Sequence, residues 1–479
     1  MGFLLPARPL ERSGARCAPP ELRGRFILEG AVRRPVGEGG VLTDRYSDLF
    51  RQRSFPAFLS AGALQFAAPA AVSIVLFYSV TIAYPVSLRE TYGALALAFL
   101  GLASALPTFA TAFFSGAIAD RSDRAQLMRA ANLIGLTGVA VLVAILLFRP
   151  ETRLGAPGGF YLPEWVALVY PTWAAVVVSS TLFRPAFNTA MVRIVPRGLL
   201  GRANGLVYAV AGGVTAAMVL AAGILLTVSV AALALGLPFL LYFVTQVALA
   251  TVSVDLSAAP RQGPARSLVH DARAGFGYIG RHRAILELTL TGLVINFLVA
   301  LATVELALYV TTWLGATQGV WYGAMVATAT VGSSVGFALA GRLRFEARAG
   351  LWMLLLTTAL GAVLFVLALI RDVWIALPTI FVFGIVPGMF TTIFLSTIQS
   401  TVAEEMMGRV FSADEVGSYA LVPIGQWAGG SLTYAVGVQG TYLTAGGTLA
   451  SFGLFTLAGF GALRRLAIRP PPTTPPEPE

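Results

Sequence analysis

Few side chains in the apolar stretches of this sequence could do acid–base or ionic chemistry. Glu305 lies 22 residues after Arg283 in one such stretch, which is about 33 Å along an α-helix. An ionisable residue inside a membrane span costs about 2.5 to 3.5 kcal/mol and therefore tends to be functional. Glu305 is either a proton-coupling or substrate-cation residue or an ordinary acid near the outer surface. Arg184 either lines a cavity or extends to the interface, and Glu287 is expected to favour a helix dipole.

The residues that metal and covalent chemistry require are almost absent. The sequence has one cysteine, Cys17, two histidines, His270 and His282, and no lysine. We therefore expect no zinc site, no disulfide framework, no cofactor and no lysine phosphate-binding loop. A membrane-embedded enzyme, such as a lipid-modifying transferase, would need a cluster of acids, histidines or cysteines at one face. Beyond Asp271, no acid-rich motif accompanies the histidines, so we do not expect an enzyme. We also expect no nucleic-acid partner.

The composition predicts an all-α polytopic membrane protein. Of the 479 residues, 57% are hydrophobic and 12% are charged, whereas a soluble domain carries roughly 25% charged residues. Uncharged stretches of about 20 residues match a hydrocarbon core of about 30 Å. Twelve such spans are predicted, at approximately 56–87, 92–119, 128–148, 164–190, 204–228, 233–254, 284–312, 317–341, 350–370, 373–398, 413–436 and 442–463.

Arginine placement predicts the orientation. If the N-terminus lies inside, the inner segments hold 28 of the 33 arginines, and the outer loops hold only Arg89, Arg149, Arg153 and Arg371. Arginine-rich short loops stay on the cytoplasmic side of a membrane. The bias therefore supports an even number of spans, with both termini in the cytoplasm of a cell with a plasma (inner) membrane.

Two segments of the sequence match at an offset of 207 residues. The matching pairs are Pro171-Thr172 with Pro378-Thr379, Phe187 with Phe394, Val195 with Val402, and Gly201-Arg202 with Gly408-Arg409. A shorter match, at an offset of 225, relates the ends of the second and eighth spans at Gly116 and Gly341. Parallel repeats of this kind are typical of one large class of secondary transporter, with the substrate path between the halves.

The repeat also divides the chain. We expect a cytoplasmic arginine-rich tail over residues 1–55, a six-helix half over 56–254, a cytoplasmic linker over 255–283, a second six-helix half over 284–463 and a proline-rich tail over 464–479. The first tail is expected to be flexible, with some attraction to anionic lipid headgroups.

The loop after the second span reads Gly116-Ala-Ile-Ala-Asp120-Arg121-Ser-Asp123-Arg124. It resembles motif A of the major facilitator superfamily, G-x-L-A-D-R-x-G-R, and departs from it only at the second glycine, which is Asp123 here. With the segments that begin at Arg184, Asp271 and Gly408, it is similar to the branch that contains the enterobactin exporter and macrolide efflux proteins.

The resemblance implies a cytoplasmic gate made by Gly116, Asp120, Arg121 and Arg124. In the family, the aspartate at the position of Asp120 interacts with the start of the eleventh helix and holds the halves closed on the inside. Arg124 corresponds to a charge-relay partner. Ser412-Ala-Asp-Glu415 forms a capping-box pattern at the expected start of that helix, so its own acids would compete with Asp120. The alternative is that these charges are solvated loop residues.

Six neutral polar residues are candidates for the central path. They are Gln65, Tyr208, Gln246, Asn296, Tyr419 and Gln426. Each is either a ligand contact or a hydrogen bond between helices. With 30 phenylalanines in the chain, a cavity should be apolar and aromatic, which favours a hydrophobic or amphipathic small molecule.

The sequence thus favours a monomeric secondary transporter that exports such molecules by alternating access, coupled to protons. The first span offers no acid for that coupling, since its residues Ala63 to Gln65 do not titrate. The alternatives are an uptake transporter of the same fold, a membrane-embedded lipid-modifying enzyme, and a receptor without transport activity.

Overall fold

Long α-helices make up most of the described chain. The computed structural model describes residues 47–52, 54–121, 123–148, 153–155, 161–195, 200–228, 231–252, 268–343, 345–402 and 404–467, which all lie in the unit formed by residues 44–479. The long helices are α2 (Phe55–Ile82), α4 (Ala94–Arg121), α5 (Arg124–Phe148), α6 (Glu164–Ile194), α7 (Leu200–Val228), α9 (Gly236–Thr251), α10 (Leu268–Arg281), α11 (Arg283–Thr303), α13 (Gly319–Arg342), α14 (Ala349–Leu367), α15 (Val373–Thr401) and α16 (Glu404–Gly459).

Short elements join these helices. They are α1 (Ser47–Phe50), α3 (Val86–Leu88), α8 (Ala231–Ala234), α12 (Leu306–Leu308), α17 (Gly461–Arg464), two π-helical turns, η1 (Arg89–Gly93) and η3 (Tyr309–Trp313), the 3₁₀ turn η4 (Glu346–Arg348), and two strands, β1 (Arg153–Gly155) and β2 (Tyr161–Pro163). The strands pair antiparallel, with Leu154 opposite Leu162. This hairpin lies in the connection between α5 and α6.

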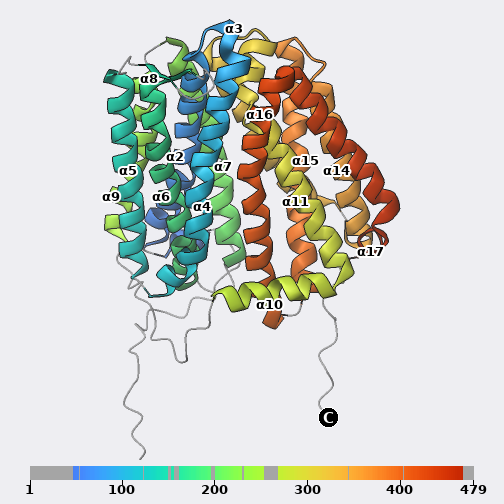
Figure 1. Cartoon of the computed structure of the whole chain (residues 1–479). Helices are drawn as coiled ribbons and strands as arrows, with labels where there is room; N and C mark the ends of the chain where they lie inside the picture. The colour runs from blue at the N-terminus through green and yellow to red at the C-terminus, as the bar shows by residue number, and fades with distance from the viewer. Residues whose placement is uncertain are drawn as a thin grey trace, which may run out of the picture. The chain divides into compact units, whose positions relative to one another are not determined.

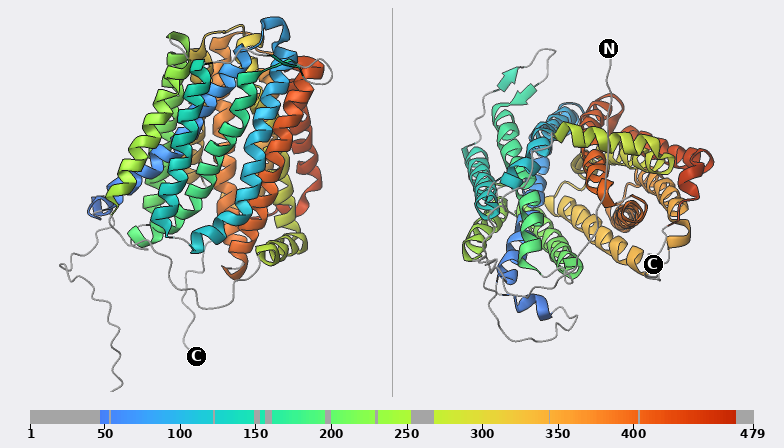
Figure 2. Two further views of the ribbon diagram at one scale, coloured as in Figure 1. Left: turned by 60° about the vertical axis from the view of Figure 1, so that its left-hand side comes forward. Right: turned by 90° about the horizontal axis from the view of Figure 1, so that it is seen from below.

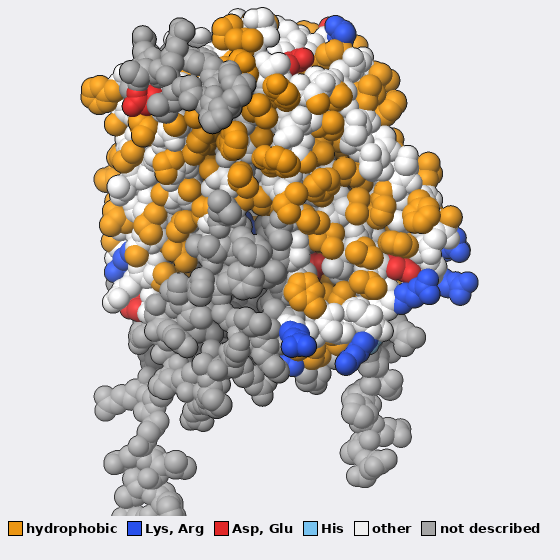
Figure 3. All heavy atoms as spheres, in the orientation of Figure 1, with side chains coloured by type: hydrophobic (Ala, Val, Ile, Leu, Met, Phe, Trp, Pro, Cys, Tyr) orange, Lys and Arg blue, Asp and Glu red, His pale blue; other side chains and the backbone are white. Residues whose placement is uncertain are grey.

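Apart from the amphipathic α10, the long helices are apolar around most of their circumference, which suits a lipid environment. Ten helices of the described chain, the first at Phe55–Ile82 and the last at Val373–Thr401, are long and apolar enough to cross a membrane. Figure 3 shows hydrophobic side chains over the visible length of these helices, whereas arginines gather near α10 and α17. These features match the predicted polytopic membrane protein.

Helix α16 supplies two further crossing segments. Gly437 interrupts it with φ 75° and ψ 171°, a backbone conformation that favours glycine because a Cβ would clash. The segments before and after Gly437 therefore run as separate helices. With the ten helices above, they confirm the twelve-helix fold. The predicted boundary at residue 442 was wrong, because one residue rather than a loop makes the turn.

The twelve segments form two six-helix halves with matching internal contacts. In the first half, α2 packs against α7 and α9, and α4 against α6; in the second, α11 packs against α16, and α13 against α15. The halves meet where α4 contacts α16 and where α7 contacts α13. In the repeat, α4 corresponds to α13 and α7 corresponds to the first part of α16. The two contacts are therefore equivalent, as expected for the predicted parallel repeats. Figures 1 and 2 show the two bundles side by side.

Two local predictions change in the structure. The end of the predicted 255–283 linker is helical, because α10 runs from Leu268 to Arg281 and lies across one end of the second half (Figure 1). We call this the α10 end and the opposite end, near α3, the α3 end. The predicted capping box at Ser412 was wrong, because α16 already begins at Glu404 and continues through this segment. Packing of the longer helix outweighs the local capping signal.

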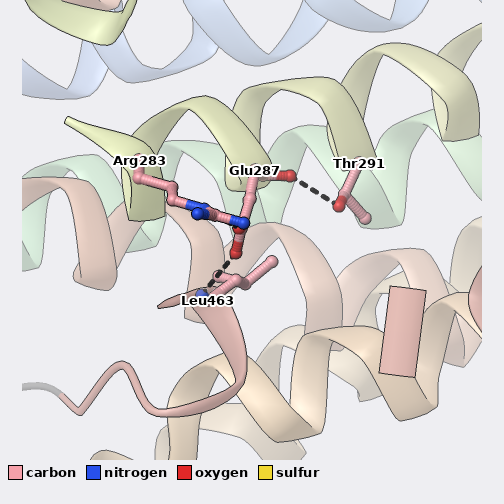
Figure 4. A network of polar contacts seen from close by, with 4 residues as sticks. All are labelled: Arg283, Glu287, Thr291 and Leu463. Carbon is pink, nitrogen blue, oxygen red and sulfur yellow. Dashed lines mark hydrogen bonds and ion pairs between the residues drawn. The ribbon is translucent and has the colours of Figure 1, made fainter. Parts of the chain in front are cut away.

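Glu287 ties the start of α11 to α17 (Figure 4). Its Oε1 accepts a hydrogen bond from Nε of Arg283 at 3.0 Å, and its Oε2 accepts one from the backbone N–H of Leu463 at 2.7 Å. The Glu287 side chain is 6% exposed, whereas that of Arg283 is 80% exposed. The first turn of α11 has no acid, so Glu287 does not take the expected place at the helix dipole. It instead makes a buried bond between segments far apart in the chain.

We predict that Glu287→Ala lowers stability by about 1 to 3 kcal/mol, because it leaves the buried N–H of Leu463 without an acceptor. The matched variant Arg283→Ala should cost less than about 1 kcal/mol, since it removes only an exposed ion pair. Unfolding midpoints of the two purified variants test this ranking. Equal losses would mean that the bond to Leu463 adds no stability beyond that of the ion pair.

Candidate functional site

A cavity of about 550 Å³ lies between the two halves. Helices α2, α4 and α6 contribute to it from one half, and α11 and α13 to α16 from the other. Its aromatic lining residues are Phe77, Trp173, Tyr322, Phe383 and Tyr442, and its smaller polar ones include Ser73, Ser104, Thr303, Thr330 and Ser333. No charged side chain is among the described residues that line it. The cavity therefore fits an apolar body with a few hydrogen-bonding groups.

Gln426 contributes an amide side chain to this lining. It projects from α16 and packs against Gly101 of α4. Its Oε1 is buried without a hydrogen bond in the described structure. A buried amide oxygen without a donor costs about 1 to 3 kcal/mol, which a ligand donor would offset. Of the predicted path residues whose side chains the structure describes, only Gln426 lines this cavity.

Hydrogen bonds between the halves seal the α3 end of the cavity. The Tyr78 hydroxyl donates to the Thr317 carbonyl at 2.6 Å. The Val320 N–H donates to Thr227 Oγ1 at 2.8 Å, and the Thr312 hydroxyl approaches Glu90 Oε1 at 3.4 Å. These three bonds join the halves within the described residues, and all three lie toward the α3 end.

Helices α7 and α13 converge toward the same end. A Cβ added at Gly323 would lie 2.8 Å from the Val219 carbonyl oxygen and 2.9 Å from Gly223 Cα, so the two backbones nearly touch. Helices α7 and α13 are antiparallel, and Gly223 lies opposite Gly323. Eighteen residues further toward the α10 end, Gly205 of α7 is therefore opposite Gly341 of α13. An added Cβ at either of these glycines meets no described atom within 4 Å. The two helices therefore diverge toward the α10 end.

Glu305 lies directly behind the cavity wall. Its neighbours Val304 and Leu306 line the cavity, while Glu305 is 0% exposed. Neither carboxyl oxygen has a hydrogen bond in the described structure; the nearby Thr433 hydroxyl bonds to Thr441 instead, at 2.8 Å. Glu305 is thus a buried acid rather than an exposed one at the membrane surface.

Three of the other predicted residues lie within the N-terminal half or on its surface. Gln65 is buried and donates to Ser179 Oγ at 3.1 Å, and Gln246 Oε1 accepts a bond of 2.7 Å from Asn132. Both make the bonds between helices that the sequence analysis had left open as their alternative role. Tyr208 is 52% exposed and stacks on Phe66.

Arg184 is exposed, and its guanidinium carbon lies 5.5 Å from the centre of the Phe66 ring. A cation over an aromatic face is stabilised by the ring quadrupole. Asn296 lines a second cavity, in the C-terminal half. The side chain of Tyr419 lies outside the described part of the structure, so its predicted role stays a prediction.

The predicted gate lies at the junction of α4 and α5. Gly116, Asp120 and Arg121 fall in the last turns of α4, and their side chains lie outside the described part of the structure; Arg124 opens α5. The gate role of these residues stays a prediction. Asp123 caps α5, because its Oδ1 accepts the Ala125 N–H at 2.8 Å. The departure from the usual glycine therefore adds a helix cap.

The hydroxyl-bearing lining residues had escaped sequence analysis. Ser73, Thr330 and Ser333 resemble the many other serines and threonines of the apolar helices, most of which bond to the preceding turn, as Ser333 also does with Ala329. No sequence signal distinguishes those that face a cavity. In the described residues, no three acidic, histidine or cysteine side chains gather into a metal site.

Comparisons with known proteins agree with this architecture. A sequence model of the Major Facilitator Superfamily matches residues 66–421. No curated protein matches the chain. Among solved structures, a bacterial homologue of the human lysosomal transporter Spinster, in an inward-facing and unoccupied conformation, is 13% identical with a TM-score of 0.62, covering 87% of this chain and 98% of that one.

Two other solved structures are similar to the same extent. The nucleoside transporter NupG, in a mutant form, is 10% identical with a TM-score of 0.63, covering 85% of this chain and 99% of that one. An auto-inhibited POT family peptide transporter is 13% identical with a TM-score of 0.61, covering 88% and 99%. At this identity the similarity shows the fold.

We predict that Gly323→Ala weakens the seal at the α3 end, because its methyl group would push the α7 backbone away. Overpacking of this kind costs about 1 to 3 kcal/mol. In a Cys17→Ser background, the rate at which a membrane-impermeant maleimide applied from the α3 side labels Thr330→Cys should rise about tenfold. The control Gly341→Ala, in open space, should leave the rate unchanged. Equal labelling rates in Gly323→Ala and Gly341→Ala would contradict the claim that the contact at Gly323 seals the α3 end.

Proposed function

The chain belongs to the Major Facilitator Superfamily, and from this premise we propose that it exports small hydrophobic or amphipathic molecules by alternating access. The family and its structural neighbours are transporters, which favours a transporter over a membrane-embedded enzyme or a receptor. The rival within this fold is uptake, and the proposed direction rests on the resemblance of motif A and its companion segments to efflux proteins.

The uncharged cavity between the halves is the observation that carries the substrate class. A phosphorylated or strongly anionic molecule would leave its charge without a partner against Trp173 and Phe383, at a large cost in free energy. A neutral amphipath would bury its apolar part there and offer a donor to Gln426. The lining therefore supports a largely apolar substrate of drug-like size.

We assign the α10 end to the cytoplasm. Exposed arginines gather there, including Arg273, Arg281, Arg342, Arg348 and Arg464. The positive-inside bias keeps such residues on the cytoplasmic side. This supports the proposal that both termini lie in the cytoplasm of a cell with a plasma (inner) membrane. With the α3 end sealed and α7 diverging from α13, the conformation described here corresponds to a cavity that faces the cytoplasm.

Transport in inverted membrane vesicles with an imposed pH gradient tests this function. We expect hydrophobic neutral compounds from a substrate panel to accumulate in vesicles that contain the protein, at least severalfold above vesicles without it. Gln426→Ala should reduce accumulation of panel members that carry a hydrogen-bond donor, because the Oε1 acceptor is lost. Accumulation only in right-side-out vesicles would reject export and favour uptake.

Glu305 is the residue that we propose for proton coupling. A buried carboxylate without donors costs several kcal/mol in its charged form. Glu90, which contacts Thr312 across the sealed end, and Tyr442 of the cavity wall lie close enough to influence it. Opening of the α3 end would expose this acid to water and change its protonation, which is the property that coupling needs.

We predict that Glu305→Gln abolishes accumulation driven by a pH gradient but leaves exchange of substrate across the membrane. Glutamine preserves the shape of the side chain and cannot release a proton. Glu164→Gln, at the first turn of α6, is the matched control and should accumulate substrate as the wild type does. Unchanged pH dependence in Glu305→Gln would remove this residue from coupling.

A further inference from the structure

The C-terminal half contains a second cavity, of about 380 Å³, enclosed by α11, α14, α15 and α16. Asp414 and Asn296 are two of its polar lining residues, and Phe390 and Phe394 of α15 form an aromatic wall. The two rings stack with their centres 6.1 Å apart. The cavity lies within one half, apart from the cavity between the halves.

The internal repeat shows where the N-terminal half has the same site. Phe183 and Phe187 of α6 precede Phe390 and Phe394 by the offset of 207 residues, and they also stack, with ring centres 5.8 Å apart. The first long helix of each half repeats the arrangement, because Gly62 of α2 packs on Phe187 as Gly292 of α11 packs on Phe394. The two aromatic walls are therefore equivalent.

The N-terminal half fills this site with apolar side chains. Phe66 stands in the place of Asn296, four residues after the matching glycine, and its ring lies 5.3 Å from that of Phe187. Val207, which precedes Asp414 by the same 207 residues, is 1% exposed in the apolar cluster of that half. With the two replacements, Phe to Asn and Val to Asp, the C-terminal half has two polar side chains and a cavity where the N-terminal half has a packed core.

The side chains of this cavity have the chemistry of an amine site. Asp414 is 9% exposed and lines the cavity from α16. The amide of Asn296 makes no hydrogen bond with the described residues and can accept one from an ammonium group. An anion would be repelled by Asp414, and a hard metal ion would need more oxygen ligands than these walls offer. Aromatic faces add a favourable interaction with a cation.

We propose that this cavity binds the protonated amine of a hydrophobic molecule, with the ammonium group between Asp414 and Asn296 and the apolar body against Phe390 and Phe394. The volume is that of a site for a drug-sized ligand. The inference rests on the side chains of one half and does not require the proposed direction of transport.

Equilibrium dialysis with the full chain in lipid nanodiscs tests the site. The probe is tritiated imipramine, a tricyclic tertiary amine, and iminodibenzyl, the same ring system without the amine chain, is the neutral comparison; empty nanodiscs correct for partition into lipid. Asp414→Asn should weaken imipramine binding by about tenfold or more, because a charge-assisted bond is lost. It should leave iminodibenzyl binding unchanged.

Asn296→Phe installs the side chain that the N-terminal half has at this place and should abolish binding by filling the cavity. Asp372→Asn, which keeps a helix cap at the start of α15, should bind imipramine as the wild type does. Thermal melting confirms that each variant is folded; Asn296→Leu replaces Asn296→Phe if the larger side chain prevents folding.

Wild-type affinity in both Asp414→Asn and the filled variant would overturn the site, as would loss of binding in Gln426→Ala alone. Amine binding without efflux in vesicles would refute the proposed function and leave this site intact. Efflux without amine binding would refute this site and leave the proposed function intact.

Discussion

The contact between α7 and α13 at the α3 end is the constraint on which the rest of the structure depends. Gly223 and Gly323 let the two backbones meet there, and the bond from Val320 to Thr227 holds the same crossing. Because each half is a packed bundle, a contact fixed at one end and absent near Gly341 at the other sets the tilt between the halves. That tilt determines which end of the central cavity is sealed.

Polar side chains within a half differ in role from those at the interface between the halves. Bonds such as that of Gln65 to Ser179 hold helices within one half, where close packing leaves little room for a ligand. Gln426, whose Oε1 makes no hydrogen bond in the described structure, faces the central cavity instead. Glu305 combines features of both groups. It is buried within one half, but its neighbours Val304 and Leu306 line the cavity between the halves. A change in tilt would therefore alter its surroundings more than those of Gln65.

The sequence predicted the architecture because hydrophobic length, arginine placement and the 207-residue repeat are properties of whole segments. It could not identify the cavity lining, because Ser73 and Thr330 have the composition of any polar residue in an apolar helix. The burial of Glu305 depends on the packing of helices that are distant in the chain, which no local pattern predicts. The capping-box prediction at Ser412 was wrong for the opposite reason, since a local signal was present but tertiary packing extended the helix.

Distances between spin labels at the two ends test the rocking of the halves most directly. Labels at positions 205 and 341 report the α10 end, and labels at 228 and 318 report the α3 end; all four residues are exposed. When substrate and a pH gradient drive the transport cycle, the first distance should shorten and the second should lengthen in the same population of molecules. Distances that stay fixed, or that change in the same direction, would contradict alternating access by two rigid halves.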